Sequence, residues 1–259
     1  MKLTLIALAL IACGFQAMAQ TPSQTEEQFC VDREDANFVK DLTMDASNLM
    51  AFTNHGGLLN GGVCWWHSRF QRNALYLTIF KPEEKKPTDQ EARKLISKIR
   101  TAKEVVVIPG FRNFAQFSGA YETQIQHEIE YWQKSEGVAK FAWVKGLSGA
   151  PKVAPRKLKE FMDKIYEDVE INKNISYNKL QIPGIDAHAW LVVHMEKVSG
   201  GYNLEILDSN TANRTEIYRY REGDTHFNYY NYFNFVPYLD QKNEMQTLKK
   251  SISKFCGSV

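Results

Sequence analysis

The pattern of apolar residues changes its period at Pro183-Gly184, and this change is the strongest constraint on the fold. Upstream, apolar residues recur every three or four positions. The clearest case is 65–80, where neither Gly nor Pro interrupts a predicted helix with one buried face. Downstream, polar and apolar residues alternate as they do in strands, over 188–198, 202–207 and 214–221. Helices followed by an antiparallel sheet predict an α+β fold.

Weaker patterns fill in this outline. Further helices are expected over 36–50, 89–98, 121–134, 155–169 and 244–255. The β-branched run 104–108 predicts a buried strand, and Ser199-Gly200-Gly201 predicts a hairpin turn. The polar stretch 21–35 is expected to be loosely held. The aromatic ribbon 227–238 is expected to be an edge strand packed on the sheet, with a platform for peptide or sugar as the alternative.

Residues 1–19 have the pattern of a secretory signal peptide, with Lys2, an apolar run and a final Ala17-Met18-Ala19. The apolar run is too short to span a bilayer as a stable helix. Leu10-Ile11-Ala12-Cys13 resembles a bacterial lipobox, which would instead leave Cys13 as a lipidated N-terminus. Both interpretations predict export. The periplasm or cell envelope is the expected location, and secretion is the other destination.

The remaining residues 20–259 suffice for a single domain. Its helical part is expected over about 36–170, its sheet part over about 175–240 and its closing helix over about 243–255. Loss of Lys2 lowers the formal net charge from +2 to +1, so charge gives no reason to expect a nucleic-acid partner. No later apolar run is long enough for an integral membrane helix.

Three cysteines remain after signal removal, namely Cys30, Cys64 and Cys256. In an oxidising compartment an odd count leaves one thiol outside any disulfide. Cys30 and Cys256 lie near the two ends of the chain, and the ends of a domain are often close in space. We therefore expect these two to be bridged and Cys64 to remain a thiol.

Cys64 is expected at the start of the 65–80 helix, just after Gly61 and Gly62. Thiolates, which are the reactive form of cysteine, are favoured at helix N-termini and beside histidines. The glycines let a bound carbonyl group approach the backbone, and the first amides of the helix, with Asn60, could hold an oxyanion. The alternative is a buried structural cysteine, which is the commoner case for an isolated Gly-x-Cys pattern.

A base and an orienting residue are expected on the downstream hairpin. His188 opens its first strand, and Asp208 ends its second strand, two residues before Asn210. In an antiparallel hairpin the start of one strand lies near the end of the next. Asp208, or Asn210 as the second choice, could accept the Nδ1–H of His188 and direct the other ring nitrogen towards Cys64.

Three motifs together resemble the papain-like cysteine peptidase superfamily. They are Gly62-x-Cys64-Trp65, His188-Ala189-Trp190 and Asp208-Ser209-Asn210, within an architectural resemblance over 54–210. The resemblance implies a helical lobe that carries the cysteine and a sheet lobe that carries the histidine and the Asp/Asn. It also implies that Cys64 is the nucleophile, His188 the base and Asp208 the orienting residue.

Two features depart from the family pattern. No glutamine stands between Gln28 and Cys64, where papain-type enzymes place an oxyanion donor, and Asn60 is the nearest amide, with Asn54 behind it. The Cys-Gly-Ser-Cys-Trp form of the true papains is also absent. The chain therefore looks like a divergent member of the superfamily.

Several neighbouring residues have plainer interpretations. His67 forms a Cys-x-x-His pair with Cys64, but no Cys/His cluster supplies further ligands, so we expect neither a metal nor a cofactor. His194 is expected on the strand face of His188, roughly 20 Å further along, as a surface or structural histidine. Arg69 and Arg72 are expected to be solvated, or else to bind an acidic group. Residues expected to line the substrate site are Gly61, Gly62, Trp65, Trp66 and Trp190.

The combined expectation is an exported thiol hydrolase. It would cleave an amide bond in a protein or in the peptide stem of peptidoglycan through an acyl-thioester. One alternative is a transglutaminase-like acyl transferase, for which the separation of Cys64 from His188 is long. The other is a non-catalytic envelope protein in which Cys64 is structural and the aromatic ribbon binds a partner.

Overall fold

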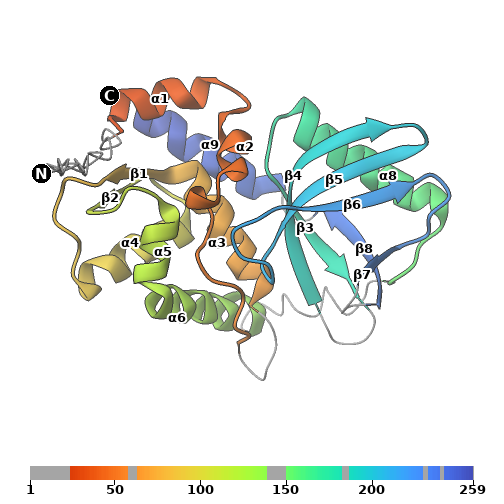
Figure 1. The fold of residues 1–259 in the computed structure, drawn as a ribbon, viewed down its shortest axis with the longest axis horizontal. Helices are drawn as coiled ribbons and strands as arrows, with labels where there is room; N and C mark the ends of the chain where they lie inside the picture. The colour runs from red at the N-terminus through yellow and green to blue at the C-terminus, as the bar shows by residue number, and fades with distance from the viewer. Residues whose placement is uncertain are drawn as a thin grey trace, which may run out of the picture.

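The structure is a computed structural model that describes residues 24–57, 63–138, 150–182, 187–229, 233–239 and 242–258. Helices gather around α3 on one side of the molecule and an antiparallel sheet lies on the other (Figure 1). The predicted α+β class is therefore confirmed. The expected signal peptide, Asn60, Gly61 and Gly62 lie outside the described residues.

The elements follow the predicted order, with several additions. The helical half contains α1 (Glu26–Glu34), α2 (Phe38–Asp41), α3 (Cys64–Leu77), α4 (Asp89–Thr101), α5 (Phe114–Ala120), α6 (Glu122–Trp132), and the parallel pair β1 (Thr78–Lys81) and β2 (Val106–Pro109). The second half contains α8 (Pro155–Tyr166), β3 (Ser176–Gln181), β4 (Ala187–Val198), β5 (Gly201–Asp208), β6 (Glu216–Arg221), β7 (Phe227–Tyr229), β8 (Phe233–Leu239) and α9 (Lys242–Cys256).

Helix α3 is the centre of the helical half. All of its residues are buried, because α4, α6, α9 and strand β4 surround it. The prediction of a single buried face is therefore wrong. Its polar side chains are accommodated by hydrogen bonds, as buried polar groups require. Gln71 Oε1 accepts from the Met50 amide at 2.7 Å, and Asn73 Nδ2 donates to the Ile99 carbonyl at 3.0 Å.

Two arginines tie α3 to the C-terminal helix. Arg69 and Arg72 are only 9% and 2% exposed, and both pair with Glu244 of α9. Arg69 also binds Glu136 at 2.5 Å. The expectation that these arginines are solvated is wrong, because buried guanidinium groups persist only with carboxylate partners.

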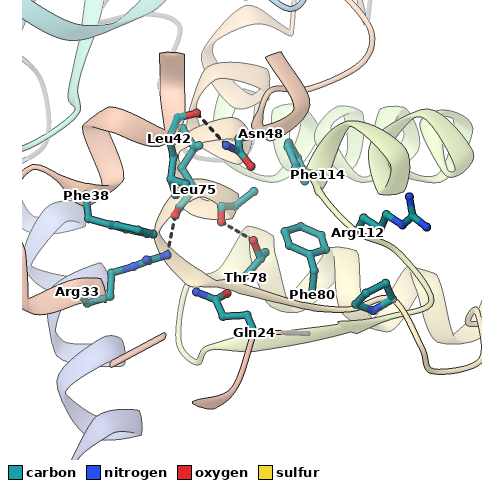
Figure 2. Close-up of a pocket in the computed structure, with 12 residues that line it drawn as sticks. Gln24, Arg33, Phe38, Leu42, Asn48, Leu75, Thr78, Phe80, Arg112 and Phe114 are labelled. Carbon is teal, nitrogen blue, oxygen red and sulfur yellow. Dashed lines mark hydrogen bonds between the residues drawn. The ribbon is translucent and has the colours of Figure 1, made fainter. Parts of the chain in front are cut away.

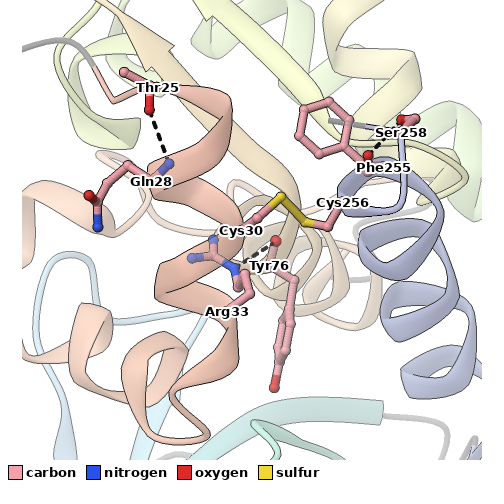
Figure 3. The surroundings of a disulfide bond; sticks show 8 residues. All are labelled: Thr25, Gln28, Cys30, Arg33, Tyr76, Phe255, Cys256 and Ser258. Carbon is pink, nitrogen blue, oxygen red and sulfur yellow. Dashed lines mark hydrogen bonds between the residues drawn. A yellow bond between two sulfur atoms is a disulfide. The ribbon is translucent and has the colours of Figure 1, made fainter.

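A disulfide fastens the other end of α9 (Figure 3). Cys30 and Cys256 are bonded, as predicted, and join α1 to α9. Phe29 meets Phe255 edge-to-face beside the bridge. Arg33 donates to the Tyr76 carbonyl at the last turn of α3. Residues 26–34 thus form a docked helix, and the expectation of a loosely held segment is wrong. A bridge that closes so long a loop stabilises a fold by about 2–5 kcal/mol.

The main sheet has the strand order β6-β5-β4-β3-β8-β7, with antiparallel neighbours. Strand β4 separates two cores, because its residues alternate between them. Ala189, Leu191 and Val193 join the cluster around α3, whereas Trp190, Val192 and Met195 join the cluster under α8.

A register shift after Val192 offsets this alternation by one residue. His194 therefore does not share the face of His188, contrary to the sequence-based expectation. Its imidazole is largely exposed and binds Glu170 at 2.8 Å.

The sheet curves so that its two edge strands approach each other around Trp190. The indole of Trp190 contacts Tyr218 of β6, Phe227 of β7 and Phe235 of β8, with ring centroids 4.8, 6.3 and 5.1 Å away. Phe227 and Phe235 also stack on each other. The described part of the aromatic ribbon therefore belongs to the sheet, as expected. It forms two strands and not one edge strand, because β7 lies at the edge and β8 pairs with both β3 and β7.

Some predicted boundaries differ for local reasons. The helix expected over 65–80 ends at Leu77, because the β-branched run at Thr78 and Ile79 pairs in parallel with Val106 and Val107. The helix expected over 36–50 is divided into α2 and two 3₁₀ turns. Within the described residues, no helix has the length and apolar character needed to cross a bilayer.

Loss of the buried ion pairs of Glu244 with Arg69 and Arg72 should lower the free energy of unfolding more than loss of an exposed ion pair. Glu244→Gln should lower the free energy of unfolding by about 2–3 kcal/mol, because it leaves buried guanidinium charge without its partner. Glu104→Gln, which breaks a half-exposed pair with Lys98, should cost less than about 1 kcal/mol. Urea unfolding of both variants is the measurement. Equal costs would mean that Glu244 does not anchor α9.

Candidate active site

Cys64 is the first residue of α3, as predicted. The carbonyl of Val63 accepts from the amides of Trp66 at 3.0 Å and His67 at 2.8 Å, so Val63 is the N-cap residue. The first amides of a helix point outwards from its N-terminus. Cys64 keeps its thiol and is only 2% exposed.

The first turn of α3 is hydrogen-bonded directly to β4. Trp65 Nε1 donates to the carbonyl of His188 at 2.9 Å, and Ser68 Oγ donates to the carbonyl of Ala189 at 3.2 Å. Both bonds are buried. They bring Cys64 beside His188, although 124 positions separate the two residues in the chain (188 − 64).

His188 contacts the residue expected to orient it. Its Nε2 lies 2.8 Å from Asp208 Oδ1, and both residues are nearly inaccessible to water. The expectation that Nδ1 faces the carboxylate is wrong, because Nε2 occupies that position. The imidazole of His188 also interacts with the Cys64 side chain, through charge and hydrogen bonding. The backbone amide of Asn210 also donates to Asp208 Oδ1, at 2.8 Å, so Asn210 supports the carboxylate.

The charges of this cluster act strongly on His188. Burial lowers the pKa of His188, but the charges of Asp208 and Cys64 and hydrogen bonds to both outweigh burial and raise the pKa to about 10. An imidazole with such a pKa holds its proton through the neutral range. The arrangement can therefore keep an imidazolium between a carboxylate and a sulfur atom.

The expected substrate-lining tryptophans lie in the interior. Trp65 and Trp66 are 4% and 5% exposed within the core around α3, and Trp190 is fully buried in the second core. Trp190 therefore packs the sheet and does not face an open cleft. Sequence reasoning missed Lys179 of β3, whose Nζ lies 4.0 Å from the centre of the Trp65 ring.

Asn54 is the more distant of the two amides considered as oxyanion donors. In the structure its side chain is bonded to groups on both sides of the site. Its Oδ1 accepts from the Gly56 and Val63 amides, and its Nδ2 donates to Asn210 Oδ1. The Asn-x-Gly spacing is typical of an Asx turn and was the signal for this role. Asn54 thus binds the loop before Cys64 to the loop after Asp208.

A cavity lies at the opposite end of α3, beside its last turn (Figure 2). It measures about 170 Å³ and opens among Arg33, Phe38, Thr78, Phe80, Arg112 and Phe114. A much smaller cavity of about 20 Å³ lies behind the cluster, between His67, Asp208 and Ser209. The smaller volume is about that of one water molecule.

His67, the histidine nearest to Cys64 in the chain, lies in the interior. It is buried, and its Nε2 lies 3.2 Å from the Phe52 carbonyl. Burial lowers the pKa of His67 to about 4, despite the Phe52 contact and the charge of Asp208. Among the described residues, no group of three or more His, Cys, Asp or Glu side chains is placed to hold a metal ion.

Because folded His67 is neutral, we expect the folded state to lose stability in acid. Folded His67 stays neutral down to about pH 4, whereas the unfolded chain takes up a proton below about pH 6.5. The unfolded state therefore binds more protons in this window, and stability falls as the pH falls. The free energy of unfolding in urea should be measured at about pH 6.5 and at about pH 4. Between these two pH values it should fall by about 3 kcal/mol more for the wild type than for His67→Gln. Parallel pH profiles would contradict a neutral His67.

Comparisons with family models, curated protein sequences and solved structures found no match to this chain. The arrangement of Cys64, His188 and Asp208 is therefore the feature of the chain that bears on its function.

Proposed function

We propose that this chain is an exported thiol hydrolase of the papain-like type that cleaves an amide bond with Cys64, His188 and Asp208. The observation that carries the proposal is the convergence of these three side chains. His188 bonds Asp208 through Nε2 at 2.8 Å, and the charges of Asp208 and Cys64 together raise the pKa of His188 to about 10 despite its burial. Such an arrangement is the general means of activating a thiol nucleophile.

The proposed reaction uses the proton on His188. The Cys64 thiolate attacks the carbonyl carbon of the substrate, and the resulting oxyanion is held by amides at the start of α3. The imidazolium of His188 gives its proton to the leaving amine, so the C–N bond breaks and a thioester remains on Cys64. His188 then takes a proton from water, which hydrolyses the thioester and releases a carboxylic acid.

Asp208 supports both halves of this cycle. Its carboxylate fixes the orientation of the ring and stabilises the imidazolium form. The expected substrate is a peptide, either in a protein or in the stem of peptidoglycan. The disulfide between Cys30 and Cys256 supports export, because such bonds persist in oxidising compartments.

The pH dependence of Cys64 alkylation tests the proposal. Between about pH 6 and about pH 8, the rate of iodoacetamide labelling should be nearly constant, because His188 keeps its proton over this range and a cationic imidazole beside a sulfur atom favours a thiolate. A small-molecule thiol gains about tenfold in rate per pH unit over this range. Quantitative mass spectrometry of the Cys64 peptide gives the rates. Burial of Cys64 lowers every rate alike, so the shape of the profile is the diagnostic quantity.

Two variants sharpen this measurement. His188→Ala should restore the tenfold rise per pH unit and slow labelling at neutral pH by about tenfold or more. Asp208→Asn should give an intermediate profile, since it removes one of the charges that raise the pKa of His188. A wild-type profile that parallels the small-molecule thiol would reject the proposed function.

A further inference from the structure

Asn54 contacts the immediate neighbours of two residues in the proposed triad. On the nucleophile side, its Oδ1 accepts from the Val63 amide at 3.2 Å. Val63 precedes Cys64 and caps α3. On the other side, its backbone amide donates to the Ser209 carbonyl at 2.7 Å, and its Nδ2 donates to Asn210 Oδ1 at 3.3 Å.

These bonds close a ring of interactions. The backbone N–H of Asn210 donates to Asp208 Oδ1. Asp208 in turn binds His188, and His188 interacts with Cys64. Cys64 is joined through Val63 back to Asn54. Segments that are more than 150 residues apart, at Asn54 and Asn210, are thereby held together beside the reacting groups.

The chemistry of the ring requires an amide side chain at position 54. The backbone N–H groups of Gly56 and Val63 donate to the side chain of Asn54, so the atom that faces them must be its oxygen. The nitrogen must then face Asn210. The terminal amide of Asn54 supplies an acceptor and a donor on two separate atoms, whereas an ionised carboxylate can only accept.

We propose that Asn54 is a positioning residue, which sets the location of Cys64 relative to the Asp208–His188 pair. This inference rests on the proposed function. A residue that merely fastened two loops would change stability alone. A positioning residue also changes how strongly His188 acts on Cys64, because charge interactions and hydrogen bonds depend steeply on distance.

Asn54→Asp is the sharpest probe. It keeps the acceptor for Gly56 and Val63, but it removes the donor and places a carboxylate against Asn210 Oδ1. Labelling of Cys64 at about pH 6 should fall roughly tenfold, and the rate should begin to rise with pH as it does for a small-molecule thiol.

Asn73→Asp is the matched control. Asn73 is a buried asparagine of α3, the helix that begins with Cys64, and its Nδ2 donates to the carbonyls of Ile99 and Arg100. Its substitution should lower the melting temperature and leave the shape of the labelling profile unchanged. A profile shift as large as that of Asn54→Asp would overturn the positioning role.

Asn210→Ala covers the case in which Asn54→Asp does not fold. It keeps the backbone bond from Asn210 to Asp208 and removes the acceptor for Asn54. It should shift the labelling profile in the same direction as Asn54→Asp. If the rate of Cys64 labelling is independent of pH in the wild type and stays so in Asn54→Asp and Asn210→Ala, the role of Asn54 is rejected. The proposed function is then left intact. A wild-type profile like that of a small-molecule thiol would count against both.

Discussion

The contact between the first turn of α3 and the beginning of β4 is the interaction on which the rest of the site depends. Trp65 and Ser68 donate to two consecutive carbonyls of β4, at His188 and Ala189. These bonds are buried, and a polar group that lost its partner there would remain without water, at a cost of about 1–3 kcal/mol. The helix start therefore cannot slide along the strand without a large penalty. The relative placement of Cys64 and His188 follows from the packing of the two halves.

Local periodicity explains what could be predicted from the sequence. A helix of period 3.6 placed Cys64 at a helix start, and an antiparallel hairpin placed His188 near Asp208. Both predictions rest on short stretches of chain. Helix α1 was missed because it is mostly polar and packs chiefly through Phe29 and the distant Cys256. The burial of Arg69 and Arg72 was missed because their shared partner, Glu244, lies far along the chain.

Other differences come from features that a residue pattern does not encode. A single register shift in β4 separates His194 from the face of His188. The choice of Nε2 over Nδ1 at Asp208 depends on side-chain rotation, which strand order leaves open. The curvature of the sheet encloses Trp190 in aromatic rings, although its place beside His188 and Ala189 made it a candidate for the substrate site.

The attachment of α9 to α3 has a consequence for the order of events during biosynthesis. Glu244 and Cys256 are made long after their partners Arg69, Arg72 and Cys30, because 172 residues separate Arg72 from Glu244 and 226 separate Cys30 from Cys256. A nascent chain that lacks its final helix has two arginines in α3 without this shared carboxylate, so the central helix cannot be enclosed in its final form. Completion of the helical half therefore waits until α9 has been made, and a chain truncated before α9 would not assemble the same surroundings for Cys64.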